Sequence, residues 1–365
     1  MEFGLSDDQR MLQETVDRAL AVAADLEIVR KAAGDDAAAQ AAIDDAVAAL
    51  GLSGIMVPEA HGGAGLGLLD AAVVQEMLGR HVTPSPFMAN AGLAAIAIAR
   101  AGTPAQQDTW LPKLAAGDAR FAAALSEAAG ARETAGVSAE GGRLTGKALF
   151  ALETRSATHV IVADRERKLH LVAMDAAGLT AHRMRSIDRT RETAELVFDS
   201  VEAEPLDGAN DPAAVTHDLI AAGRVLLAAD TLGAGQRMIE KAVAYAMERE
   251  QFGRTIGSFQ AVKHLCAEMA ARLEPCRSLI WFAAHTMDAE PDEFPVMAAL
   301  AKSHTAETGT FVARTATEVH GGMGFTDLMG LHYWFKRIGL NRQLLGGPET
   351  VRADAARMQG YGDAA

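Results

Sequence analysis

Apolar residues recur every three or four positions through two long stretches in the second half of the chain. This spacing places them on one face of a helix. The first set is Leu226, Leu227, Ile239, Val243 and Met247, and the second is Ala261, Leu265, Met269, Leu273 and Ile280. Between them, Gly253 and Gly257 interrupt the pattern, and glycines of this kind favour turns. The pattern predicts two long helices joined by a turn, with the second helix beginning near Ser258.

Helical spacing also marks the first third of the chain. Ser6 and Gln9 form a capping box, in which each side chain bonds the backbone N–H of the other residue, ahead of a first helix. Further helices are expected over 35–50, 69–79 and 91–101, and the segment 107–117 closes this helical part. The glycine-rich stretch 62–65 lacks the Lys-Ser/Thr of a phosphate-binding loop, so we interpret it as a connector.

The middle of the chain follows a different pattern. From Phe121 onward, short runs rich in β-branched residues are bounded by glycines or charged turns, which is typical of strands. These runs cover 143–145, 158–164, 168–174 and 193–199. After Pro205 the helical spacing returns, and Pro275 is expected to kink one helix. We predict an α+β fold with a helical domain over 1–119, a β domain over 120–205 and a helical bundle over 206–365.

Composition and charge limit the function. The chain has 365 residues, of which 49% are hydrophobic, enough for a large buried core in more than one domain. Its net charge of −14 argues against nucleic acid or an anionic membrane as a partner. The N-terminus lacks a signal-peptide pattern, and no apolar run is long enough to span a bilayer. We therefore expect a cytoplasmic protein, in which Cys266 and Cys276 are reduced, buried thiols outside any metal-ligand pattern.

Two motifs point to chemistry. The predicted turn reads Arg249-Glu-Gln-Phe-Gly, with Gln260 following, and the second motif reads His320-Gly-Gly-Met-Gly-Phe. In this order and spacing they resemble the two signatures of the acyl-CoA dehydrogenase family. The order of helical, β and helical segments is similar to that family over nearly the whole chain. The resemblance implies a flavin enzyme that introduces an α,β double bond into an acyl-CoA.

The resemblance also implies which residues hold FAD. The family's turn binds the flavin of the neighbouring subunit, which assigns cofactor contacts to Arg249, Phe252 and Gln260. The second signature lies beside the adenine–ribose end of FAD, which assigns Gly321 and Gly322, with Glu318 where the family has Gln. The simpler alternatives are a salt bridge of Arg249 with a neighbouring glutamate, core packing of Phe252, and a packed rather than catalytic His320.

The ring side of the flavin site departs from the family. Residues 126–133 match the family's Thr-Glu-Pro-Gly-Ala-Gly-Ser-Asp, which crosses the flavin ring. Ser126 keeps a hydroxyl for the ring edge, but the proline and both glycines are missing in register, and Arg132 stands at the serine position. The family's Trp-Ile-Thr, which also contacts the ring, aligns with 150–152. Phe150 retains an aromatic side chain there, but the hydroxyl group of the Thr is absent.

The catalytic base is the largest departure. The family's base is a Glu that removes the proton alpha to the thioester, and burial raises its basicity. Its usual position is Leu345 or Gly346 here, and its alternative position on the earlier helix is Gly223. Glu349 lies a few residues beyond the usual position and can act as the base only if the loop is rearranged. Its simpler role is to complement the dipole at a helix N-terminus.

These departures favour one hypothesis over two others. Some bacterial acyl-CoA dehydrogenases of steroid side-chain degradation pair a base-carrying subunit with a degenerate one, and this chain resembles the degenerate subunit of such a heterotetramer. The expected partners are then an acyl-CoA, a sister subunit, and an electron-transfer flavoprotein or similar acceptor. The alternatives are a homo-oligomeric enzyme that uses an unusual base such as Glu349, and a scaffold that keeps the fold without catalysis.

Overall fold

The computed structural model describes residues 4–130 and 136–362. Its first part is helical: α1 (Asp7–Ala23), α2 (Leu26–Ala33), α3 (Ala37–Ala49), α4 (Leu68–Arg80), α5 (Ala95–Ala101) and α6 (Pro104–Ala116), with short 3-10 helices η1 (Leu52–Gly54) and η2 (Glu59–His61). The capping box of Ser6 and Gln9 is confirmed at the start of α1. The helix expected over 91–101 begins earlier, as the π-helix η3 (Met88–Ala94) that continues into α5.

The sheet follows directly. Its strands are β1 (Phe121–Ala124), β2 (Val137–Glu140), β3 (Arg143–Leu152), β4 (His159–Ala163), β5 (Leu169–Ala173), β6 (Leu179–Arg183), β7 (Thr193–Glu202) and β8 (Glu204–Pro205). They lie in the order β6-β7-β3-β1-β4-β5-β8, with β2 on β3. Only the β1–β4 pair is parallel among these ladders, and all of β1 is buried. The apolar residues of β1 are therefore covered on both faces.

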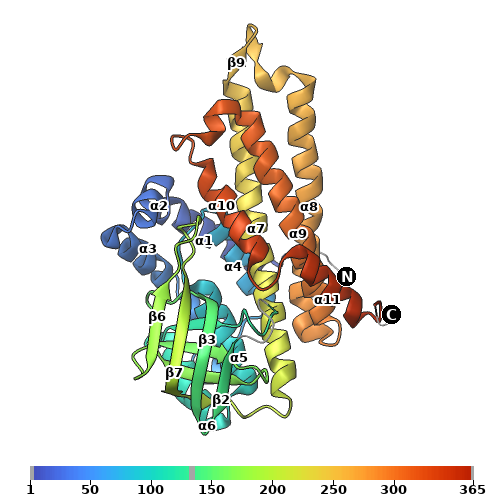
Figure 1. Ribbon diagram of the computed structural model, residues 1–365. Helices are drawn as coiled ribbons and strands as arrows, with labels where there is room; N and C mark the ends of the chain where they lie inside the picture. Colours follow the sequence, from blue (N-terminus) through green and yellow to red (C-terminus); the bar gives the residue numbers. More distant parts are fainter. Residues whose placement is uncertain (1–3, 131–135, 363–365) are drawn as a thin grey trace.

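The remaining helices are α7 (Pro212–Glu248), α8 (Gln260–Ala289), α9 (Phe294–His320), α10 (Leu331–Gln343) and α11 (Pro348–Met358). The hairpin of β9 (Glu250–Gln251) and β10 (Arg254–Thr255), followed by η4 (Ile256–Ser258), joins α7 to α8. A last 3-10 helix, η5 (Gly321–Phe325), follows α9. The long helices run side by side, with the hairpin at one end and the sheet beside the other end of α7 (Figure 1). The α+β architecture is thus confirmed, while the boundaries at 119 and 205 stay predictions.

The centre of the core is α7, which contacts α4, α8, α9 and α10. Its approach to α4 depends on two glycines. A Cβ at Gly233 would lie 1.8 Å from the Glu76 carbonyl oxygen, and a Cβ at Gly79 would lie 2.0 Å from that of Asp230. Any side chain at either position would therefore force the two helices apart.

Three details differ from the expectations or extend them. Helix α2 was not predicted, and α8 continues through Pro275 without ending. Cys276 is buried as expected, but Cys266 is only half-buried, and both thiols are free. Among the described residues, no helix is both long and apolar enough to cross a lipid bilayer.

Candidate functional site

A cleft of about 730 Å³ lies between the sheet and the helices α7 and α11. The segment after β1 and the turn between β4 and β5 form one wall. The other wall consists of His217, Ile220 and Arg224 from α7 with Thr350, Asp354, Arg357 and Met358 from α11. The site therefore depends on segments far apart in the sequence. The described residues contain no group of three His, Cys, Asp or Glu side chains that could hold a metal ion.

Arginines dominate the charged lining of this cleft. Arg224 Nη2 donates to Asp354 Oδ2 at 2.8 Å, and Arg357 also contacts Asp354. In the described part of the chain, the exposed side chains of Arg165 and Arg167 have no ion-pair partner, and both line the cleft. The cleft therefore offers two unpaired cations to an anionic ligand, despite the acidic net charge. Sequence reasoning missed them, because two arginines in a turn carry no motif.

Gly223, the predicted alternative position of the base, lies beside Leu345, which with Gly346 is a candidate for the usual position. A Cβ at Gly223 would lie 2.4 Å from Leu345 Cδ1, and Leu93 from the π-helix η3 is the next neighbour. Leu345 is buried at 3% exposure. The space beside Gly223 is thus filled by apolar side chains rather than by a carboxylate.

The loop at Leu345 is held in a left-handed conformation. Leu345 has φ 55° and Gly346 has φ 105°. Arg224 Nε donates to the Leu345 carbonyl oxygen at 3.0 Å. A branched residue in this region of φ is strained, so the arginine fixes a conformation that the chain would otherwise avoid.

The surroundings of Glu349 do not suit a catalytic base. It lies in the first turn of α11, its side chain is 70% exposed, and its Oε1 accepts from Arg342 Nη2 at 3.0 Å. A hydrogen bond to its own backbone N–H and the Arg342 guanidinium lower the pKa of the carboxyl. A base for this proton transfer needs the opposite shift. The position of Glu349 at the helix N-terminus agrees with the simpler role of complementing the helix dipole.

Ser126, which the sequence predicts to contact the flavin ring, precedes a residue of the cleft wall. It is buried, its Oγ is 3.5 Å from the Phe150 carbonyl oxygen, and the neighbouring Glu127 lines the cleft. Phe150 has φ 53°, next to a register shift between β3 and β7. The predicted departure at Arg132 lies outside the described residues.

The other predicted cofactor residues lie elsewhere, at the hairpin end of the long helices. Arg249 and Gln260 are exposed, and Phe252 is 91% exposed with φ 53°. Core packing of Phe252 and a salt bridge of Arg249 are therefore both absent from the described residues. The described part of the chain therefore leaves all three side chains exposed, and their predicted cofactor contacts stay predictions.

The second signature reaches the same end of the bundle. His320 is buried, stacks on Tyr245 at 4.6 Å between ring centroids, and its Nδ1 donates to the Ala316 carbonyl oxygen at 2.7 Å. Glu318, Gly321 and Gly322 are exposed, and nothing lies within 4 Å of a Cβ built at either glycine. The backbone at both glycines is therefore open to a ligand, as the predicted contact with FAD requires.

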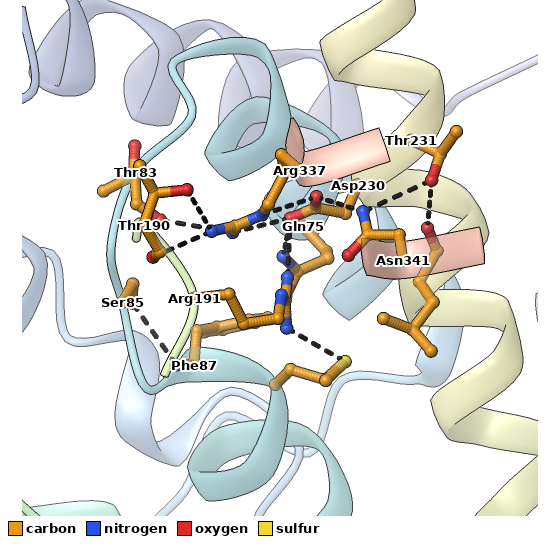
Figure 2. A network of polar contacts seen from close by, with 12 residues as sticks. Gln75, Thr83, Ser85, Phe87, Thr190, Arg191, Asp230, Thr231, Arg337 and Asn341 are labelled. Carbon is orange, nitrogen blue, oxygen red and sulfur yellow. Dashed lines mark hydrogen bonds and ion pairs between the residues drawn. The ribbon is translucent and has the colours of Figure 1, made fainter. Parts of the chain in front are cut away.

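A buried polar network centres on a residue that sequence reasoning missed. Asp230 of α7 is fully buried and accepts from Arg337 Nε at 2.9 Å, Arg191 Nη2 at 2.9 Å, Gln75 Nε2 at 2.7 Å and Asn341 Nδ2 at 2.6 Å (Figure 2). Burial opposes its charge, but Arg337 and Arg191 outweigh burial and lower its pKa. The network ties α4, α10 and the β6–β7 segment to α7. The sequence did contain one signal of this network, because Asp230 is an acidic residue within an apolar stretch of a predicted helix.

Comparison with known proteins agrees with this geometry. The family model of the acyl-CoA dehydrogenase N-terminal domain matches residues 6–118, and that of the C-terminal domain matches 213–359. Acyl-CoA dehydrogenase IpdE2 of Mycobacterium tuberculosis is 31% identical over 352 residues, which cover 94% of this chain and 95% of the relative. The human mitochondrial short-chain specific acyl-CoA dehydrogenase is 31% identical, with 79% of this chain and 76% of the relative covered.

Solved structures extend the similarity to the whole fold. The ChsE4-ChsE5 complex from Mycobacterium tuberculosis superimposes with a TM-score of 0.87 and 26% identity over 100% of both chains. A variant of the Tcur3481-Tcur3483 steroid ACAD gives a TM-score of 0.86 and 29% identity, covering 97% of this chain and 98% of the other. Fold, motifs and relatives agree, and the chain belongs to the acyl-CoA dehydrogenase family.

Proposed function

We propose that this chain is the base-lacking subunit of an FAD-dependent acyl-CoA dehydrogenase and works with a sister chain of the same fold that carries the base. The observation behind the proposal is the apolar contact of Gly223, the predicted alternative base position, with Leu345, which with Gly346 is a candidate for the usual one. Removal of the α proton requires a carboxylate close to the substrate. Neither position offers one.

No other carboxylate in the described lining is suited to replace it. Glu127 Oε1 accepts from the Leu149 N–H at 2.9 Å, and Asp164 accepts from His170 at 2.8 Å. Asp354 is held by Arg224 at 2.8 Å. Each of these carboxylates is already engaged by a hydrogen-bond or ion-pair partner. Burial opposes the charge of Asp164, but hydrogen bonds from His170 and the Lys168 N–H outweigh burial and lower its pKa.

The polar lining supports binding of an acyl-CoA in the cleft. Arg165 and Arg167 lie on its rim and are able to bind phosphate groups, which Arg recognises through two N–H groups at once. Coenzyme A carries several phosphates, so these residues suit the polar end of the ligand. The acyl group is bulky under this proposal, in keeping with the steroid ACAD among the similar structures.

The exposed residues at the hairpin end support a role toward the sister chain. Arg249, Phe252 and Gln260 from the turn, with Gly321 and Gly322, would hold the adenine side of an FAD bound mainly by that chain. FAD supplies the hydride acceptor when it is bound. The protein's contribution there is to bind the cofactor and cover it from water. The similar ChsE4-ChsE5 structure is also a complex.

The visible absorption spectrum of the protein, purified alone and after co-expression with candidate sister chains, tests the proposal. We expect a colourless lone chain and a yellow complex with both chains in equal amounts. Glu349→Gln in this chain should leave the activity of the complex within about twofold, whereas replacing the sister's base should abolish it. A lone chain that is yellow and is bleached by an acyl-CoA would establish the self-sufficient alternative.

The scaffold alternative predicts a different result. A chain that keeps the fold without catalysis forms no yellow complex with any sister chain. Arg249→Ala then changes nothing, whereas under our proposal it lowers the flavin content of the complex. Lys263→Met, at an exposed position of α8, serves as the charge-matched control.

A further inference from the structure

The turn between β4 and β5 carries Arg165 and Arg167, which line the cleft and have no ion-pair partner in the described part of the chain. Both side chains are exposed. A ligand that binds them has to order two long, flexible side chains, which costs conformational entropy. That cost is smaller when the backbone beneath the side chains is already fixed in one conformation. The contacts of this turn therefore bear on how well the cleft binds an anion.

The carboxylate of Asp164 fixes the turn from within. Its Oδ1 accepts from the Glu166 N–H at 2.8 Å and from the Lys168 N–H at 2.9 Å. Its Oδ2 lies 2.8 Å from His170 Nε2, and the Asp164 side chain is 3% exposed. The lowered pKa of this carboxyl keeps it charged near neutral pH, and a charged carboxylate can only accept, so His170 Nε2 donates. Both oxygens of Asp164 are thus bonded to the turn or to the strand that follows it.

Thr216 of α7 fixes the same turn from the opposite wall of the cleft. Its side chain is fully buried, and its Oγ1 donates to the Arg167 carbonyl oxygen at 2.7 Å. Arg167 has φ 60°, a left-handed conformation that residues with a side chain rarely adopt. Such a conformation persists where surrounding contacts hold it in place. The Thr216 hydroxyl is a contact of this kind.

The backbone of Arg165 is fixed by a third contact. Its N–H donates to the Val137 carbonyl oxygen at 2.9 Å, which ties the turn to β2. Its side chain starts beside Gly136, where a Cβ would lie 3.7 Å from Arg165 Cγ. Both arginines of the cleft therefore extend from a backbone that is bonded on several sides.

Asp164 has two opposite effects on an anion in the cleft. Its negative charge lies in the cleft wall and repels a phosphate group. Its oxygens also fix the turn that presents Arg165 and Arg167 to the same group. The arginines can bond a phosphate directly, whereas the buried carboxylate faces its own hydrogen-bond donors. Positioning should therefore outweigh repulsion.

We propose that Asp164 and Thr216 are positioning residues for the phosphate groups of the ligand, and that the turn 164–168 makes the cleft prefer thioesters of coenzyme A to thioesters of pantetheine, which lacks phosphate. Both residues act through Arg165 and Arg167 rather than by contact with the ligand. This inference rests on the function proposed above, which places coenzyme A in this cleft.

Calorimetric titration of the full chain with coenzyme A and with pantetheine tests the proposal, in complex with the sister chain if the protein is isolated that way. The ratio of the two dissociation constants measures the preference for the phosphate-bearing ligand. Thr216→Val should reduce this preference by about fivefold, because a charged hydrogen bond from Arg167 is weakened. Pantetheine binding itself should change by less than about twofold.

Thr286→Val is the matched control. Thr286 of α8 is also fully buried, and its Oγ1 donates to the Ala283 carbonyl oxygen at 2.8 Å. This substitution removes the same kind of hydrogen bond from the core, but at a residue that does not line the cleft. It should leave the preference for coenzyme A unchanged.

Arg167→Met separates positioning from a general loss of structure. If Thr216 acts through Arg167, Thr216→Val should not reduce the preference further in a chain that already carries Arg167→Met. Any fall in melting temperature caused by Thr216→Val should persist in that chain. A further reduction of the preference would show that Thr216 does not act through this arginine and would overturn its assigned role.

Two substitutions at Asp164 separate positioning from charge. Both Asp164→Asn and Asp164→Ala remove the negative charge, so repulsion alone predicts tighter binding of coenzyme A in both variants. Asp164→Asn keeps an oxygen for the Glu166 and Lys168 N–H groups, and it should retain the preference for coenzyme A. Asp164→Ala removes this acceptor, and coenzyme A should bind about tenfold more weakly.

The outcomes distinguish this inference from the proposed function. Unchanged or tighter binding of coenzyme A by Asp164→Ala, or an unchanged preference in Thr216→Val, would overturn the positioning role and leave the proposed function in place. If Asp164→Ala does not fold, Thr216→Val decides. If the unchanged protein binds coenzyme A no better than pantetheine, both this inference and the placement of coenzyme A in the cleft are wrong.

Discussion

Leu345 packs against Gly223 so closely that a Cβ added at position 223 would lie 2.4 Å from Leu345 Cδ1. The two residues are more than a hundred positions apart. The sequence predicts the family's alternative base position at Gly223 and its usual one at Leu345 or Gly346. A carboxylate cannot be restored at Gly223 while Leu345 fills the space.

This contact predicts that two substitutions are not additive. Gly223→Ala alone should lower the free energy of unfolding by about 1–3 kcal/mol, because it overpacks the contact. Leu345→Ala alone should lower it by about 2–5 kcal/mol, because it opens a cavity. In the double variant the added methyl group occupies part of that cavity, so the total loss should be at least about 1 kcal/mol below the sum.

Urea unfolding of the three variants measures this coupling. Gly339→Ala is the matched control, since nothing lies within 4 Å of a Cβ at this helical position. It should be neutral or stabilise the protein by up to about 1 kcal/mol. Strict additivity of the first two substitutions would show that Gly223 and Leu345 do not share one packed space.

Removal of the charge of Asp230 should strongly destabilise the protein. Asp230→Asn leaves Arg337 and Arg191 buried without their shared counter-ion, at a cost of about 3–5 kcal/mol. Asp218→Asn is the control on the same helix, because Asp218 pairs with Arg100 at 3.3 Å in a half-exposed position. Its effect should stay below about 1 kcal/mol. Equal midpoints of chemical unfolding for the two variants would contradict this account.

Glu153 should make stability depend on pH. Burial raises the pKa of its carboxyl to about 7, although Arg191 and the Ala89 N–H partly oppose the shift. The folded state thus holds a proton that the unfolded state releases near pH 4.5. The stabilisation is complete below that value, declines as pH rises through about 7, and then stays lost. The difference is on the order of 3 kcal/mol.

Glu153→Gln removes this titration and keeps an oxygen for the Ala89 N–H, which donates to Glu153 Oε2 at 2.8 Å. Relative to the unchanged protein, the variant should therefore gain stability between pH 5 and 8. Urea unfolding at several pH values measures the gain. Glu140→Gln, at an exposed position of β2, should show no such trend. A gap between Glu153→Gln and the unchanged protein that is constant with pH would rule out titration of this carboxyl.

Phe252 should matter for assembly and not for folding. Its ring is 91% exposed, so Phe252→Ala should change the free energy of unfolding of the single chain by less than about 0.5 kcal/mol. If the ring packs on a sister chain, the same change should weaken the complex by about tenfold or more, since buried aromatics often dominate interfaces. Tyr361→Ala, at another exposed ring, is the control for analytical ultracentrifugation of the complex. Unchanged association in both variants would remove Phe252 from the interface.

Local patterns determined much of the architecture. Helical spacing around Leu226 and Leu273 identified α7 and α8, and the capping box placed the start of α1 at the correct residue. These signals are local, because each depends on neighbours within one or two helical turns. The π-helix η3 carried no such signal, since its apolar sequence fits an ordinary helix equally well.

The sequence by itself determined the family, the helical–β–helical order and the absence of Glu at Gly223, Leu345 and Gly346, because each can be read from residue identity and spacing. Only the tertiary structure decided what fills the space beside Gly223, since Leu345 meets it across two distant segments. It also decided that Asp230 is bound by two buried arginines. Contacts between distant residues depend on how the elements pack, and no local pattern specifies that packing.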